Sequence, residues 1–375
     1  MRRFEWANAL RGVAALTVLA CHFAVAFWIS QDVSAGLARR RPLYPGSTGA
    51  PGFARVLDSL PVDLAALGVS LFFLLSGFVI AISLERYSRR GFLVGRLMRV
   101  LPTYASGYLV TCGVIWLMSD PNHELSPSSI LSGAVPGLAL LVRVSAPGDG
   151  IVWTLIVELV FYAVCLATYR ALTRHWQAIV AVAAGCVAMQ WILGSVALDP
   201  HLAGLAYVVA LACPFIPVML VGVTLSARRR ERLSGRATAI VVPLLAATYV
   251  LLASTTTVAP ASVKYRATFV FAMTAFAMIA AVGDRWRQHP VASFFADISY
   301  PLYVVHPVLG YATISVLTGH GVPSALAVLA ASVVALVAAW CLHVIVEAPT
   351  HTLGRRWAGR FPASIPVAAP VHADA

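Results

Sequence analysis

Apolar stretches of about twenty residues recur along almost the whole chain, and each is long enough to cross the hydrocarbon of a bilayer. Within that hydrocarbon a helix satisfies its own backbone hydrogen bonds, so such stretches are expected to be helical. The composition agrees, because 60% of the residues are hydrophobic and 11% are charged. We therefore expect an all-α fold, a polytopic bundle of transmembrane helices with no second domain.

The apolar stretches divide into about ten spans separated by arginine-containing loops. If the N-terminus lies in the cytosol, 19 of the 27 basic residues fall on the cytosolic side, as the positive-inside rule requires. An even number of spans then places both termini in the cytosol. The expected spans cover residues 9–29, 62–83, 101–119, 151–170, 177–197, 203–225, 237–255, 267–283, 294–317 and 323–346.

The remaining segments complete this outline. Residues 128–146 are apolar but contain Gly133, Pro136 and Gly137, so we expect a short re-entrant or interfacial helix there. Residues 1–360 then form one transmembrane domain, and the Ala- and Pro-rich residues 361–375 form a disordered tail. The net charge of +12 follows from loop arginines and predicts no nucleic-acid partner. The expected location is the bacterial inner (plasma) membrane.

The first span contains the most informative polar pair, Arg11 and His22, in the segment RGVAALTVLACH. Eleven helical steps of about 100° return almost to the starting angle, so both side chains share one face, roughly 16 Å apart along the axis. Ionisable groups within a membrane span require a functional or structural explanation. His22 suits a general base, and the alternative is a histidine bonded between helices or lining a pore.

A second cationic pair, Arg96 and Arg99, lies in GRLMRVLPTY before the third span. Residues three apart face the same way on a helix, and two guanidinium groups on one face can bind phosphate bidentately. The alternative is ordinary positive charge at the cytosolic face. Upstream, Ser76 and Gly77 are small enough to allow close helix packing.

Two further polar positions occur within spans. Glu158, in WTLIVELVFY, is interpreted either as an acid paired to an arginine or as a partner that orients a histidine. His306, in ISYPLYVVH, shares a face with Ser299, and a structural role for it is at least as well supported as a catalytic one. Glu347, near the end of the last span, is expected to pair with a cytosolic arginine.

Several of these segments together resemble the acyltransferase 3 family of membrane acyltransferases. The resemblance covers essentially the whole apolar region, because the segments occur in the family's order from the first span to the last. They are RGVAALTVLACH, GVSLFFLLSGFVI, GRLMRVLP, WTLIVELVFY, ISYPLYVVH and VEAP.

This resemblance implies acyl transfer from cytosolic acyl-CoA, usually acetyl-CoA, to a hydroxyl group. The implied acceptors are carbohydrates, glycolipids or other cell-envelope or secreted molecules. The family's essential arginine and histidine correspond to Arg11 and His22, its arginine pair to Arg96 and Arg99, and its acid to Glu158.

The hypothesis from sequence is therefore O-acyl transfer with His22 as general base, Glu158 as its partner, and Arg11, Arg96 and Arg99 binding acyl-CoA. The expected partners are acyl-CoA, a carbohydrate or glycolipid-type hydroxyl acceptor and membrane lipid. We expect no metal, and the chain contains no H-E-x-x-H motif. The alternative is a secondary transporter or flippase for an anionic or sugar-bearing solute, in which His22 and Glu158 would relay protons.

Overall fold

The computed structural model describes residues 4–44, 46–118, 126–142, 150–195, 199–256, 262–283, 286 and 289–363. In these ranges the ordered elements are helices, apart from one isolated bridge between Tyr87 and Pro362, so the all-α prediction is confirmed. Of the expected disordered tail, residues 361–375, the structure describes only 361–363, and residues 364–375 lie outside the described residues.

Among the described residues, eight helices are long and apolar enough to span a membrane. Two of them contain a wider π-helical turn, at His22–Ala26 and at His343–Glu347. The first runs through α1 (Glu5–Cys21) and α2 (Phe27–Ile29), and the last through α18 (Ser324–Leu342) and α19 (Ala348–Ala358). The others are α5 (Leu64–Arg86), α6 (Arg89–Met118), α11 (Gln177–Ser195), α14 (Gly235–Thr255), α15 (Val263–Val282) and α17 (Ser299–Gly319).

The two remaining predicted spans take other forms. Residues 203–225 correspond to a pair, α12 (Ala203–Ala212) and α13 (Ile216–Arg229), bent by 46°. Residues 151–170 correspond to α9 (Val152–Ala167), which is apolar but only 16 residues long. Thus each of the ten expected spans coincides with a helix or a bent helix pair.

Several boundaries differ from the prediction. The span expected at 294–317 begins instead at Ser299, because α16 (Pro290–Asp297) is a separate short helix. The helix expected from 101 begins at Arg89, so Arg96 and Arg99 belong to the spanning helix itself and Pro102 lies inside it. The last helix continues beyond 346 to Ala358.

The short helices lie between these spans. As expected, residues 128–146 do not form a span, since they contain α7 (Pro127–Gly133) and α8 (Leu138–Val142), while 143–149 lie outside the described residues. The segment after the first span folds into α3 (Gln31–Ala38) and α4 (Gly52–Asp58). The remaining elements are α10 (Tyr169–Arg174) and a short 3₁₀ turn at Pro200–Leu202.

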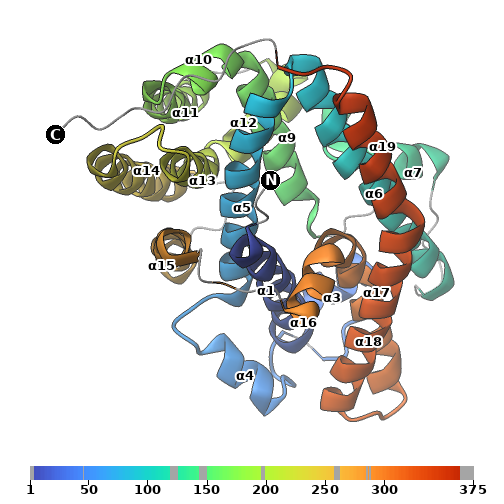
Figure 1. Ribbon diagram of the computed structural model, residues 1–375. Coiled ribbons are helices and arrows are strands. Elements are labelled where there is room, and N and C mark those ends of the chain that lie inside the picture. Colours follow the sequence, from blue (N-terminus) through green and yellow to red (C-terminus); the bar gives the residue numbers. More distant parts are fainter. Residues whose placement is uncertain are drawn as a thin grey trace.

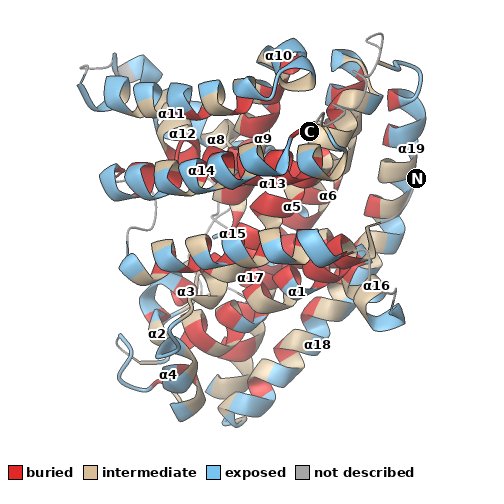
Figure 2. Cartoon of the chain, turned by 60° about the vertical axis from the view of Figure 1, so that its left-hand side comes forward, coloured by how far each residue is buried: buried red, intermediate tan, exposed pale blue. Residues whose placement is uncertain are grey.

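Helix α5 lies at the centre of the bundle (Figure 1), packed against α13, α1 and α15. Helix α17 forms a second centre and packs against α18, α6 and α1. Both helices are largely buried, whereas α11, α14 and α18 have many exposed residues on their outer faces (Figure 2). The buried helices α1, α5 and α17 also contribute most of the polar residues discussed below.

Helices α5 and α13 approach closely because each has a glycine at their crossing. A Cβ atom on Gly77 would lie 1.8 Å from the carbonyl oxygen of Met219, and one on Gly222 would lie 2.1 Å from that of Leu74. Neither backbone can move without displacing its helix. The prediction that Gly77 permits close helix packing is therefore confirmed.

Gly77→Ala is expected to destabilise the protein by about 3 kcal/mol, because overpacking against a backbone carbonyl cannot be relieved by a side-chain rotation. A thermal unfolding curve in detergent should shift downward by about 6 °C. Gly185→Ala is the matched control, since a Cβ there meets nothing within 4 Å and alanine favours the helix. Equal unfolding temperatures for the two variants would contradict the packing argument.

Candidate active site

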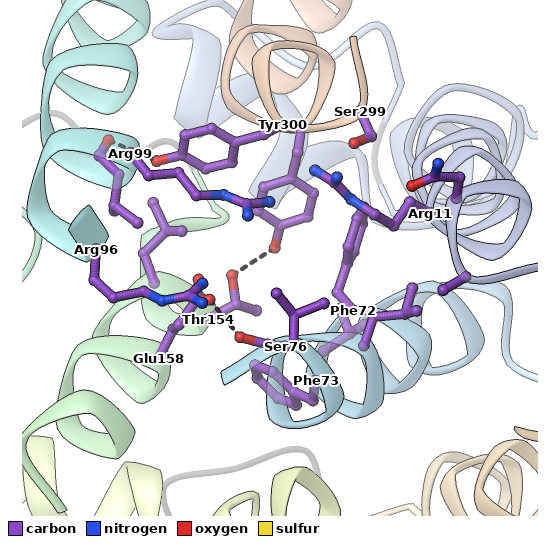
Figure 3. Close-up of a pocket in the computed structure, with 18 residues that line it drawn as sticks. Arg11, Phe72, Phe73, Ser76, Arg96, Arg99, Thr154, Glu158, Ser299 and Tyr300 are labelled. Atoms are coloured by element: carbon purple, nitrogen blue, oxygen red, sulfur yellow. Dashed lines mark hydrogen bonds between the residues drawn. The ribbon is translucent and has the colours of Figure 1, made fainter. Parts of the chain in front are cut away.

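The main cavity has a volume of about 280 Å³ and lies between α1, α5, α6, α9 and α17 (Figure 3). Apolar side chains such as Phe72 and Phe73 form part of its wall. Three guanidinium groups and one carboxylate also line it, so its lining is cationic. The polar residues around it are Asn8, Arg11, Ser76, Arg96, Arg99, Thr154, Glu158, Ser299, Tyr300 and Tyr303.

Arg96 is held by protein groups. Its side chain donates a hydrogen bond to the Ser83 hydroxyl. Its guanidinium lies over the rings of Phe92 and Tyr162, 5.8 and 5.9 Å from their centroids. Only 7% of the residue is exposed. Arg96 is therefore a fixed positive charge in the cavity wall.

Arg11 and Arg99 differ from Arg96, because neither makes a hydrogen bond or salt bridge with any described residue. Their guanidinium groups point toward each other from α1 and α6 across the cavity (Figure 3). Two facing cations within an apolar bundle repel each other, and an anion between them would remove that cost. This pair is the feature of the cavity that best defines its ligand.

The cationic region continues beyond the main cavity into two adjoining spaces. One, of about 210 Å³, is lined by Arg11, Arg99 and Arg355 together with His351, and the carboxylates of Asp297 and Glu347 also line it. The other, of about 180 Å³, is also lined by Arg99, His351 and Arg355. Sequence reasoning missed His351 and Arg355. Their spacing of four residues on the helix after the last span was the available signal.

Glu158 lies in the main cavity, where its Oε1 atom accepts hydrogen bonds from Ser76 at 2.5 Å and from Tyr162 at 2.7 Å. Through Tyr162 it is linked to Arg96, which agrees with the interpretation of Glu158 as an acid associated with an arginine. The described contacts of Glu158 do not include His22, so the structure does not bring the two together as base and orienting partner. Glu347 likewise pairs with His343, at 2.6 Å, instead of the expected arginine.

His22 lies beyond the inner end of the cavity and is not among its lining residues. The ring of Tyr303, which does line the cavity, packs edge-on against Phe72 with centroids 5.4 Å apart. Val18 and Ile151 are buried in the same small apolar cluster. Arg11 and His22 both face α17, as their shared helical face predicts, but this aromatic layer separates them.

The Nδ1 atom of His22 is 2.8 Å from the hydroxyl of Tyr311, and the two rings are stacked. Ser34 of α3 lies near the Tyr311 hydroxyl. Ser34 in turn donates to the backbone carbonyls of Ser30 at 3.0 Å and Ala26 at 3.2 Å.

The Tyr311 hydroxyl either accepts from Nδ1–H of His22 or donates to an unprotonated Nδ1. In the first arrangement the Nε2 atom of His22 is unprotonated, which is the state that a general base requires. Tyr311 does not stand at a spacing from His22 that the sequence could reveal.

Among the residues that the structure describes, no group of three or more His, Cys, Asp or Glu side chains is arranged to hold a metal ion. The described part of the chain has a cluster of arginines around a cavity, and a histidine that is bonded to a tyrosine. These features define a polytopic helical membrane protein with a cationic internal cavity that suits an anionic ligand.

Comparison with known proteins identifies the family. The family model described as an acyltransferase domain matches residues 4–344, and the chain therefore belongs to the acyltransferase 3 family. A curated relative, "Acyltransferase MdmB" from Streptomyces mycarofaciens, is 28% identical over 199 residues, or 49% of this chain. The match spans 45% of that relative, less than half of its length. No solved structure matches the chain.

Proposed function

We propose that this protein is a membrane O-acyltransferase that moves an acyl group, acetyl in the simplest case, from cytosolic acyl-CoA to a hydroxyl group. The proposed acceptor is a carbohydrate or another cell-envelope or secreted molecule. The observation that carries the proposal is the facing pair Arg11 and Arg99, which make no hydrogen bond or salt bridge with a described residue, in a cavity that ends one aromatic layer from His22. Because the chain belongs to an acyltransferase family, we interpret this cavity as the binding site for an acyl donor.

The arginines would bind the nucleotide end of acyl-CoA. Its phosphates carry several negative charges, and planar guanidinium groups bind phosphate oxygens bidentately. In this proposal Arg11, Arg99 and Arg355 hold the phosphates where the three cavities adjoin. The pantetheine arm then occupies the apolar-walled main cavity. The rings of Phe72 and Tyr303 must move apart for the thioester to reach His22.

The proposed chemical step takes place at His22. Nε2 removes the proton from the acceptor hydroxyl while the hydroxyl oxygen forms a bond to the thioester carbonyl carbon. The carbon–sulfur bond then breaks, the ester is formed, and the imidazolium returns its proton to the departing sulfur to give CoA. Positioning both substrates in one site lowers the barrier further. An acyl-histidine intermediate, formed by direct attack of Nε2, is a variant of the same scheme.

The direct test uses purified protein in lipid nanodiscs with radiolabelled acetyl-CoA. An acyltransferase consumes the label, releasing free CoA by transfer to an acceptor or by slow transfer to water. A transporter for an anionic or sugar-bearing solute would leave acetyl-CoA intact. Tight binding of acetyl-CoA without any CoA release, in the presence of a membrane-lipid and glycan extract, would count against the proposal.

Tyr311→Phe is expected to lower turnover about tenfold and to leave the KM for acetyl-CoA unchanged. The variant retains the stacked ring but no longer fixes the proton on Nδ1 of His22, so part of the population has the wrong tautomer. Initial rates over a range of acetyl-CoA concentrations measure both quantities. Tyr169→Phe is the matched control, since its hydroxyl also makes a 2.7 Å hydrogen bond, to the carbonyl of Tyr87. Equal rates for the two variants would contradict the orienting role.

A further inference from the structure

A separate cavity, of about 140 Å³, lies on the opposite face of α5 from the arginine-lined spaces described above. It is lined by Ala81, Leu84 and Glu85 of α5, whereas Ser83 and Arg86 of the same helix line the 180 Å³ space. Helical steps of about 100° place these two sets on opposite faces. The cavity shares no lining residue with the other three, so the proposed acyl transfer does not use it.

This cavity lies where three apolar helices end. Helix α5 ends at Arg86, α13 ends at Arg229 and α11 begins at Gln177. Residues of all three helices line the cavity, together with the end of α10 and the segment that joins it to α11. The ends of spanning helices lie near the bilayer surface, at the depth of the lipid head groups, where tryptophan is enriched. Trp176 of the joining segment lines the cavity and is 38% exposed.

Positive charge exceeds negative charge in and beside this cavity. Among the described residues, Glu85 is the acid that lines it, and its two carboxylate oxygens accept separately from Arg230 and Arg232. Arg174 lines the cavity as well, is exposed, and makes no hydrogen bond or salt bridge with any described residue. Three guanidinium groups therefore stand against one carboxylate, which leaves two positive charges uncompensated in this group of four.

A structural role explains only part of this group. The bonds to Glu85 tie the segment after α13 to the end of α5, and the three side chains are partly buried. Arg174 takes no part in that tie. Arg232 uses one nitrogen, Nη1, for Glu85, and a guanidinium has five N–H donors. Arg174 and Arg232 thus line one cavity with donors that the described residues do not use.

The lining of the cavity indicates the chemistry of its ligand. Two arginines favour a phosphate group, which guanidinium groups bind bidentately. A free phosphate would leave the apolar wall unmatched, and a zwitterionic lipid would bring an ammonium group toward an existing excess of positive charge. An anionic phospholipid suits both the charge and the wall. The apolar wall consists of Ala81, Leu84, Leu172, Ile179, Val223 and Ala227.

We propose that this cavity binds one anionic phospholipid, with Arg174 and Arg232 bonded to its phosphate and the first carbons of its acyl chains on the apolar wall. The lipid comes from the leaflet at the Arg86 end of α5. Once bound, it links α5, α11 and α13 and compensates the excess charge, so it stabilises the folded protein. The inference does not depend on the proposed function, because it requires neither acyl-CoA nor His22.

The test is native mass spectrometry of the delipidated protein in an uncharged detergent, which resolves individual bound lipids and gives the Kd of the first. We expect phosphatidylglycerol to bind at least about tenfold more tightly than phosphatidylcholine with the same acyl chains. In Arg174→Ala the first phosphatidylglycerol should bind about tenfold more weakly than in the native protein, as for loss of a charged hydrogen bond. The unfolding temperature without lipid should stay unchanged, because Arg174 has no bond to a described residue that the variant would lose.

Two comparisons control this experiment. Arg170→Ala is the matched variant, because Arg170 is also exposed and lies one turn earlier on α10, but does not line the cavity. It should bind phosphatidylglycerol as the native protein does. Glycerol 3-phosphate offers a phosphate without acyl chains and should raise the unfolding temperature of the native protein less than phosphatidylglycerol does at equal concentration.

Several results would overturn the inference. One is an equal Kd for phosphatidylglycerol in the native protein and Arg174→Ala, and another is an equal loss of affinity in Arg170→Ala and Arg174→Ala. Equal binding of phosphatidylglycerol and phosphatidylcholine would show that the charge of the lipid is not recognised. Equal stabilisation by glycerol 3-phosphate would identify the ligand as a soluble phosphate compound. None of these results bears on CoA release from acetyl-CoA, and a failure of acyl transfer would leave the lipid site standing.

Discussion

Replacing His22 with alanine should lower acyl transfer by at least about 10³-fold while the protein still folds and binds acyl-CoA. General bases contribute rate factors of about 10²–10⁴, and His22 contacts none of the arginines that would bind the donor. The measurement is CoA release from radiolabelled acetyl-CoA, paired with an equilibrium binding curve for CoA. Binding should change less than twofold.

The same experiment can contradict the assignment of His22 as the general base. If a purified His22→Ala protein had native turnover, His22 would not be the base, and the cavity would have no identified base. Loss of binding along with turnover would instead place His22 in the donor site, against its position beyond Phe72 and Tyr303. His320→Ala, on an exposed helix end, controls for the general effect of removing an imidazole.

The double variant Arg11→Ala/Arg99→Ala should weaken CoA binding about 10³-fold. Each guanidinium bonded to a phosphate contributes about 1.5–3 kcal/mol, and neither residue makes a hydrogen bond or salt bridge with a described residue that the variant would lose. The remaining binding should also depend less steeply on salt, because fewer charge contacts remain. Isothermal calorimetry at two ionic strengths measures both effects.

Two single-residue comparisons sharpen this result. Arg356→Ala is the matched control, because Arg356 neighbours Arg355 on α19 but lies outside the three cavities. Arg96→Ala should behave differently and lower the unfolding temperature, because Arg96 is bonded to Ser83 and packs over the rings of Phe92 and Tyr162. If Arg356→Ala weakens CoA binding as much as the double variant does, the phosphate assignment is wrong.

Sequence predicted the fold well because the membrane imposes a length and a composition on every spanning segment. It could not predict local interruptions such as the bend between α12 and α13 or the separate helix α16, since these depend on packing against neighbouring helices. The positions of the termini relative to the membrane stay predictions, because charge bias alone supports them.

The site was predicted in part. Arg11, Arg96, Arg99 and Glu158 do line one cavity, although they come from three helices. The position of His22 behind Tyr303 could not be foreseen, because helical periodicity fixes the direction of a side chain and not what lies in front of it. The contact of Tyr311 with His22 joins distant segments, for which the sequence has no local signal.

Ser34 belongs to α3, in the long segment 30–61 between the first two spans, and it lies near the Tyr311 hydroxyl that is bonded to His22. If His22 is the base, the reactivity of that base depends partly on this segment. The segment could then not be exchanged freely during evolution to suit a new acceptor, because changes in acceptor preference and in the competence of His22 would be inherited together.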